Sequence, residues 1–164
     1  MNRKAITFLL ILTVFCTVIP AGLFFTHESP QQIMAENFLT RLLTVSDYSE
    51  YKKYTSTYTG ADFVNKLSEG YSNYFTAEGF SHFRISPFPR MYLSMADVSK
   101  CTYQVKKIYL KKQQFEDKNR MTYIFDVTLK VTDSQGNTSE KIQTGILNFI
   151  KEKNEWKINS VRLY

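Results

Sequence analysis

The stretch from residue 121 to residue 151, MTYIFDVTLKVTDSQGNTSEKIQTGILNFIK, decides the fold of this chain. Apolar and polar residues alternate along Met121–Thr132 and again along Glu140–Lys151, which is the period of a strand with one buried face. The segment Ser134–Asn137 between them has the length and composition of a hairpin loop. The stretch therefore predicts two long antiparallel strands.

The same alternation continues on both sides of this hairpin. Thr102–Phe115 comes before it and Trp156–Leu163 comes after it, and short polar segments at Glu116–Asn119 and Lys153–Asn154 make the connections. Connections this short join neighbouring antiparallel strands. We therefore expect a four-stranded antiparallel meander over residues 102–163.

The hairpins also predict which residues share a face. The first hairpin pairs Ile108 with Val127, and the second pairs Leu129 with Ile142 if it turns about residues 135–136. A shift by one residue would exchange the two faces, and the two registers agree on one apolar face. The predicted inner face consists of Ile108, Leu110, Phe125, Val127, Leu129, Ile142 and Ile146.

Some apolar residues then point away from this core. An open antiparallel sheet normally presents polar side chains to water, and monomers rarely expose large apolar patches. Either the first helix or the preceding loop covers the patch, or the patch is an interface with a subunit or partner. The candidate interface residues are Ile124, Leu147, Phe149 and Ile158.

The residues before the sheet have helical spacing. Ser29-Pro30 is typical of a helix start, and the apolar residues that follow predict an amphipathic helix to about Val45. A second short helix is expected from Ser49 to Tyr58, and a third begins after Gly60. Thr76 could cap a further turn or two. Pro87 and Pro89 interrupt the pattern, which predicts a loop or an irregular edge over residues 86–97.

The N-terminal segment predicts a membrane anchor. Residues 5–25 carry no charge, and about 20 apolar residues suffice to span the hydrocarbon core. Arg3 and Lys4 precede the stretch, so the positive-inside rule places the N-terminus in the cytoplasm. Of the 164 residues, 1–26 would form the cytoplasmic tip and anchor, and 27–164 one domain outside the cytoplasm.

Two other interpretations of this segment stay open. Cleavage after Ala21 would make the segment a signal peptide and the protein secreted, and acylation of Cys16 would make it a lipoprotein. In each case residues 27–164 are exported. Cys101 is then the one cysteine of the domain, so no disulfide forms within it, and a small buried side chain is the commoner role for such a residue.

Helices followed by a long meander that ends in a tryptophan strand resemble the nuclear transport factor 2-like superfamily. The resemblance lies in YFTAEGF at 74–80 and NEWKINSV at 154–161, where Asn154-Glu155 replaces the usual glycine turn. It implies an α+β cone over residues 30–164, with about three helices packed on a curved four-stranded sheet. Membrane-anchored bacterial members, including VirB8-type components of conjugative secretion machines, are similar in layout.

Catalytic motifs are scarce in this chain. Some enzymes of the superfamily use an Asp or an Asp/His pair, for which the candidates here are Asp126 and His82. Asp126 lies on the predicted outer face opposite Tyr109, where a solvated carboxylate is the commoner role. No phosphate-binding glycine loop, metal-spaced cluster or nucleophile elbow is found in the sequence. We expect no catalytic residue, cofactor or metal, although scattered carboxylates leave an enzyme open.

The formal charge is +6, and six basic residues gather around the first hairpin. Basic strands with interleaved aromatics can follow single-stranded nucleic acid, but lysines on an edge strand also prevent aggregation. Contact with anionic lipid or wall polymer is a third interpretation. The edge interpretation is favoured for an exported domain, and no nucleic-acid partner is expected. The residues are Lys106, Lys107, Lys111, Lys112, Lys118 and Arg120.

Together these patterns predict a non-catalytic interaction or assembly domain of an envelope complex. Its partner would be another protein or a second copy of the chain, and a conjugative (type IV) secretion component is the most specific version. The alternatives are a cone that binds a small apolar ligand or acts as an enzyme, and a module that binds a wall or lipid surface.

Overall fold

The computed structural model describes residues 29–113 and 117–164 of the chain. The predicted anchor at residues 5–25 and Cys16 lie outside this range and stay predictions. None of the helices within the described ranges combines the length and apolar character that a bilayer crossing requires.

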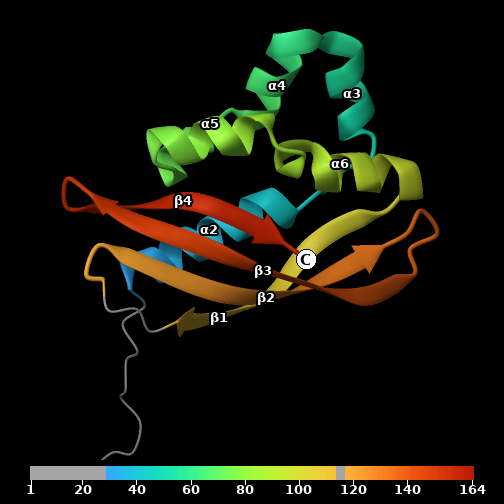
Figure 1. Ribbon diagram of the computed structural model, residues 1–164. Coiled ribbons are helices and arrows are strands. Elements are labelled where there is room, and N and C mark those ends of the chain that lie inside the picture. The colour runs from blue at the N-terminus through green and yellow to red at the C-terminus, as the bar shows by residue number, and fades with distance from the viewer. Residues whose placement is uncertain (1–28, 114–116) are drawn as a thin grey trace, which may run out of the picture.

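The described chain forms helices first and then a meander (Figure 1). The sheet has the strand order β1-β2-β3-β4, and each neighbouring pair is antiparallel. This confirms the predicted α+β class and meander. The helices are α2 (Pro30–Leu43), α3 (Glu50–Thr57), α4 (Gly60–Ser68), a 3-10 turn (Ser72–Tyr74), α5 (Ala77–Ile85) and α6 (Phe88–Ser99). The strands are β1 (Thr102–Gln113), β2 (Arg120–Thr132), β3 (Thr138–Glu152) and β4 (Glu155–Leu163).

Helix α2 begins as the sequence predicts. The Ser29 side chain accepts a hydrogen bond from the Gln32 N–H, and the Gln32 side chain accepts one from the Ser29 N–H, so two of the free N–H groups at the helix start are satisfied. Helix α2 then lies against the sheet and buries its apolar face, which consists of Ala35, Phe38, Leu39, Leu42 and Leu43.

The loop predicted over residues 86–97 is wrong, because this segment forms most of α6. Pro87 is the residue before the helix and Pro89 lies in its first turn. A proline in the first turn removes no helical hydrogen bond, since the N–H groups there have no partner within the helix. The two prolines therefore start a helix, and this helix buries Tyr92 and Ala96 in the core.

The first hairpin has the predicted register, and the second does not. Ile108 lies opposite Val127, as expected, but Leu129 lies opposite Lys141 instead of Ile142. The second loop spans Asp133–Asn137 and is held by the Asp133 carboxylate, which accepts hydrogen bonds from the N–H groups of residues 135 and 137 at 2.8 and 2.9 Å. The turn therefore centres on residue 135 alone, and the pairing shifts by one residue.

This shift exchanges the two faces of β3, so three predicted interface residues are corrected. Leu147, Phe149 and Ile158 lie in the core, with exposures of 0, 1 and 0%. The bulge between β3 and β4 at Asn148/Phe149 adds one residue to β4, which lets both Ile158 and Val161 face inward. Ile142, predicted to lie inside, is 65% exposed, and Ile146 also lies outside the core.

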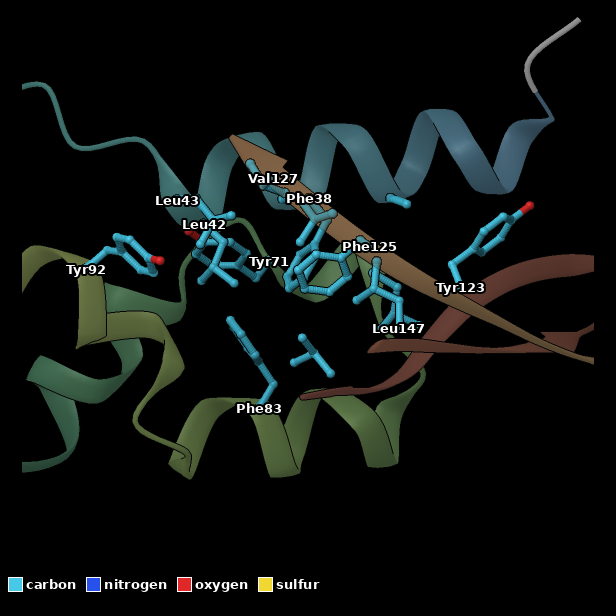
Figure 2. Close-up of a cluster of buried hydrophobic side chains, with 14 of the residues drawn as sticks. Phe38, Leu42, Leu43, Tyr71, Phe83, Tyr92, Tyr123, Phe125, Val127 and Leu147 are labelled. Atoms are coloured by element: carbon cyan, nitrogen blue, oxygen red, sulfur yellow. The ribbon is translucent and has the colours of Figure 1, made fainter. Parts of the chain in front are cut away.

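Phe38 of α2 is the centre of the core. Its ring meets the rings of Tyr71, Tyr74, Phe75 and Phe83 edge-on, with centroids 5.3–6.1 Å apart. Figure 2 shows Phe38, Tyr71 and Phe83 in one cluster with Leu147 of β3. The aromatic residues of the helices and the apolar face of the sheet therefore fill one shared interior.

The two sequence segments that carry the resemblance contact each other. Phe75 forms a parallel bridge with Ile158, and the Thr76 N–H donates to the Ile158 carbonyl at 3.0 Å. The Thr76 hydroxyl donates to the Asn159 side-chain oxygen at 2.9 Å and accepts from the Gly79 N–H, which caps α5 as predicted. These bonds hold the start of α5 on the edge of β4.

We expect Gly79→Ala to destabilise the protein, although alanine normally favours a helix over glycine by about 0.5–1 kcal/mol. A Cβ atom at residue 79 would lie 2.6 Å from the Asn159 carbonyl oxygen and 2.9 Å from that of Ile158. Both atoms are backbone, so we expect a net loss of about 1–3 kcal/mol. Denaturant unfolding of the full chain in detergent, followed by circular dichroism, measures it.

Ser81→Ala is the matched control, since Ser81 is exposed in the same helix. Its effect should stay within about 0.5 kcal/mol. A gain in stability from Gly79→Ala would contradict the close approach of α5 to β4.

Candidate functional site

The outer face of the sheet carries an apolar patch. The buried residues of β2 and β3 alternate with partly exposed ones, and in Figure 1 α2 passes behind the strands while no described helix lies in front of them. Ile124 lies directly opposite Ile146 on this face, so its predicted outward orientation is confirmed. We call Ile124, Ile142, Ile146 and Ile150 the outer isoleucine patch.

A groove of about 510 Å³ lies beside this patch. Three polar side chains on neighbouring strands form a hydrogen-bonded chain in its wall: the Thr122 hydroxyl donates to the Asn148 side-chain oxygen at 2.7 Å, and the Asn148 amide donates to the Ser160 hydroxyl at 2.8 Å. At one end of the groove the Arg120 Nε atom lies 3.5 Å from the Asp117 Oδ2 atom. These groups can hydrogen-bond a polar partner, and they contain no nucleophile paired with a base.

The sequence did not single out Thr122, Asn148 or Ser160. Neutral polar residues are ordinary on the solvent face of a strand. They meet because β2, β3 and β4 pair in one register next to a bulge, and the bulge has no local signal in the sequence.

The six basic residues are all exposed, and β1 is an edge strand of the sheet, as predicted. Lys106 pairs with Glu140 at 2.6 Å and Arg120 with Asp117. Within the described part of the chain, the other four have no ion-pair partner. These four are Lys107, Lys111, Lys112 and Lys118.

The two candidate catalytic residues lie on different elements of the structure. Asp126 is exposed on the outer face of β2 opposite Tyr109, whereas His82 is exposed on α5, which packs with the other helices on the inner side. Among residues 29–113 and 117–164, no three His, Cys, Asp or Glu side chains gather as metal ligands would. The structure therefore does not bring Asp126 and His82 together into one site.

Apolar and aromatic side chains pack together in the interior of the cone. Burial raises the pKa of Tyr71 and of Tyr92 to about 12, so both stay neutral. The Tyr92 hydroxyl donates to the Gln143 side-chain oxygen at 2.7 Å, and the Gln143 amide donates to the backbone carbonyls of Thr144 and Tyr164. A cavity of about 210 Å³ remains between α5, the start of α6 and β4, and its lining includes Phe75, Phe83 and Val161.

No protein-family model matches this chain, and no curated protein matches it in sequence. Among solved structures, an IcmL-like type IV secretion system protein from Legionella pneumophila matches 83% of this chain and 92% of its own length, at 12% identity and a TM-score of 0.53. The two chains share a fold. The cone-and-sheet fold expected from the nuclear transport factor 2-like resemblance is therefore confirmed.

Two further solved structures match at lower TM-scores. A periplasmic fragment of TraM is 12% identical, with 81% of this chain and 93% of that fragment covered and a TM-score of 0.47. The periplasmic domain of DotI is 13% identical, with 83% and 95% covered and a TM-score of 0.45.

The two faces of β3 predict losses of stability of very different size for the same substitution. Leu147→Asp would bury an unpaired carboxylate and remove a core side chain, so we expect a loss of about 3 kcal/mol or more. Ile142→Asp places the same group where the side chain is 65% exposed and should cost no more than about 1 kcal/mol. Denaturant unfolding of both variants measures the difference. Equal losses would contradict the register of the second hairpin.

Proposed function

We propose that this protein is a non-catalytic assembly component of an envelope complex. Residues 5–25 would anchor it in the membrane with the N-terminus in the cytoplasm, and residues 27–164 would form its extracytoplasmic interaction domain. The most specific version is a VirB8-type component of a conjugative or type IV secretion apparatus. Its partners would be other proteins of the complex or further copies of the chain.

The outer isoleucine patch is the observation that carries this proposal. Ile124 and Ile146 form a direct cross-strand pair on the two central strands, and Ile142 is 65% exposed on the same face. An uncovered sheet face is normally polar, because its side chains meet water. An apolar centre beside a polar groove is the arrangement of protein interfaces, in which the rim supplies hydrogen bonds.

The shared fold supports the same proposal. The matched protein from Legionella pneumophila is an IcmL-like type IV secretion system protein, and the match covers 92% of its length. The placement of Asp126 on β2 and of His82 on α5 also favours binding over catalysis. Fold alone does not fix function, so the proposal depends on the surface patch and the predicted anchor together.

The predicted orientation has a direct test. A C-terminal fusion to alkaline phosphatase should be active in bacterial cells, and a C-terminal fusion to green fluorescent protein should stay dark, because phosphatase folds outside the cytoplasm and the fluorescent protein does not. Phosphatase fused directly after Lys4 should be inactive. A fluorescent full-length fusion would contradict the exported domain.

The outer isoleucine patch should also contact a partner in cells. We expect a photo-crosslinking amino acid at Ile142 of the full chain to give discrete adducts with other subunits of the envelope complex. Val98, which is 82% exposed near the end of α6, is the matched control and should give none. Mass spectrometry identifies the adducts. Absence of adducts at Ile142, or the same adducts at both positions, would contradict an interface on this face.

A further inference from the structure

The outer edge of β1 is open along most of its length. On one side β1 pairs with β2 throughout. On the other side Val45 exchanges two backbone hydrogen bonds with Tyr103, at 2.8 and 2.9 Å. Beyond this bridge, no described segment pairs with this edge of β1. The edge is therefore paired with another backbone segment at one end and is unpaired from about residue 106 to residue 113.

The register fixes which backbone groups are free. The Val45 bridge shows that the N–H and C=O of Tyr103 point away from β2. The register shifts by one residue between Val105 and Lys107, and the alternation of antiparallel pairs then makes the groups of Ile108, Leu110 and Lys112 point away from β2. Free groups spaced two residues apart are a template for one more strand.

The two faces of this edge have different chemistry. Lys107, Tyr109 and Lys111 alternate on the outer face, where both lysines lack an ion-pair partner within the described residues and Tyr109 is 58% exposed. Ile108 and Leu110 lie on the inner face, half-buried against the core. An added strand would therefore meet positive charge on one face and apolar surface on the other.

We propose that the β1 edge binds an extended segment of a partner protein as a fifth strand, and that this segment alternates acidic and apolar residues. The acidic residues would lie beside Lys107 and Lys111, and the apolar residues would extend the inner face past Ile108 and Leu110. A second copy of β1 is a poor occupant, because its lysines would face these lysines. The same charges thus repel self-pairing and select an acidic partner.

This inference is separate from the proposed function, because it concerns the edge of the sheet and not the outer isoleucine patch. The probe is a fluorescein-labelled nine-residue peptide of alternating glutamate and valine, and fluorescence anisotropy measures its binding to the full chain in detergent. We expect saturable binding. A peptide of alternating lysine and valine, and the acidic peptide with every backbone amide methylated, should bind at least about ten-fold more weakly.

Charge and backbone pairing can be separated by substitution. Lys107→Glu with Lys111→Glu should weaken binding of the acidic peptide about ten-fold, whereas Lys141→Glu with Lys151→Glu, at two exposed lysines of β3, should not. Lys112→Pro removes an outward N–H without removing a bond to β2, so it should weaken binding more than Lys112→Gln, which loses only the charge.

Three results would overturn the inference. The first is no binding of the acidic peptide, and the second is equal binding of its methylated form, which would mean charge attraction without strand pairing. The third is binding of phosphatidylglycerol vesicles that depends on Lys107 and Lys111 while the peptide does not compete, which would identify a lipid surface as the ligand. If any of these occurs while Ile142 still cross-links to partner subunits, the edge inference fails and the assembly proposal stands.

Discussion

The close approach of α5 to β4 is the constraint on which the rest of this structure depends. Gly79 lets the helix backbone lie against the strand, and Thr76 joins the two through the Ile158 carbonyl and the Asn159 side chain. This contact positions Phe75 and Phe83 against Phe38 of α2. The rings of the helices thereby pack in the interior of the cone, while no described helix covers the outer face of the sheet.

Elements with a strong local signal could be predicted from the sequence. The Ser29 cap, the four strands and the register of the first hairpin follow from residues that are close in the chain. The second hairpin could not be placed, because the Asp133 carboxylate selects a five-residue loop and shifts the pairing. The α6 segment was misassigned, since Pro87 and Pro89 start a helix as readily as they end one.

The wrong register of the second hairpin also made part of the predicted interface wrong. A shift of one residue moved Leu147 and Phe149 into the core and brought Ile142 and Ile146 to the surface. The idea of an apolar outer face survives with different residues, and Ile124 belongs to both versions. The exposure of the β1 lysines was predicted correctly, because an unpaired lysine side chain is almost never buried.

The contact between Thr76 and Asn159 joins residues 83 positions apart. A ribosome makes the helices before the sheet, so α5 leaves the ribosome long before the strand that completes its packing. Until β4 has been made, Phe75 and its neighbours lack the last strand of the sheet, and exposed apolar surface of this kind promotes aggregation. If the domain is exported unfolded, in line with the proposed function, this contact forms only after β4 has also crossed the membrane.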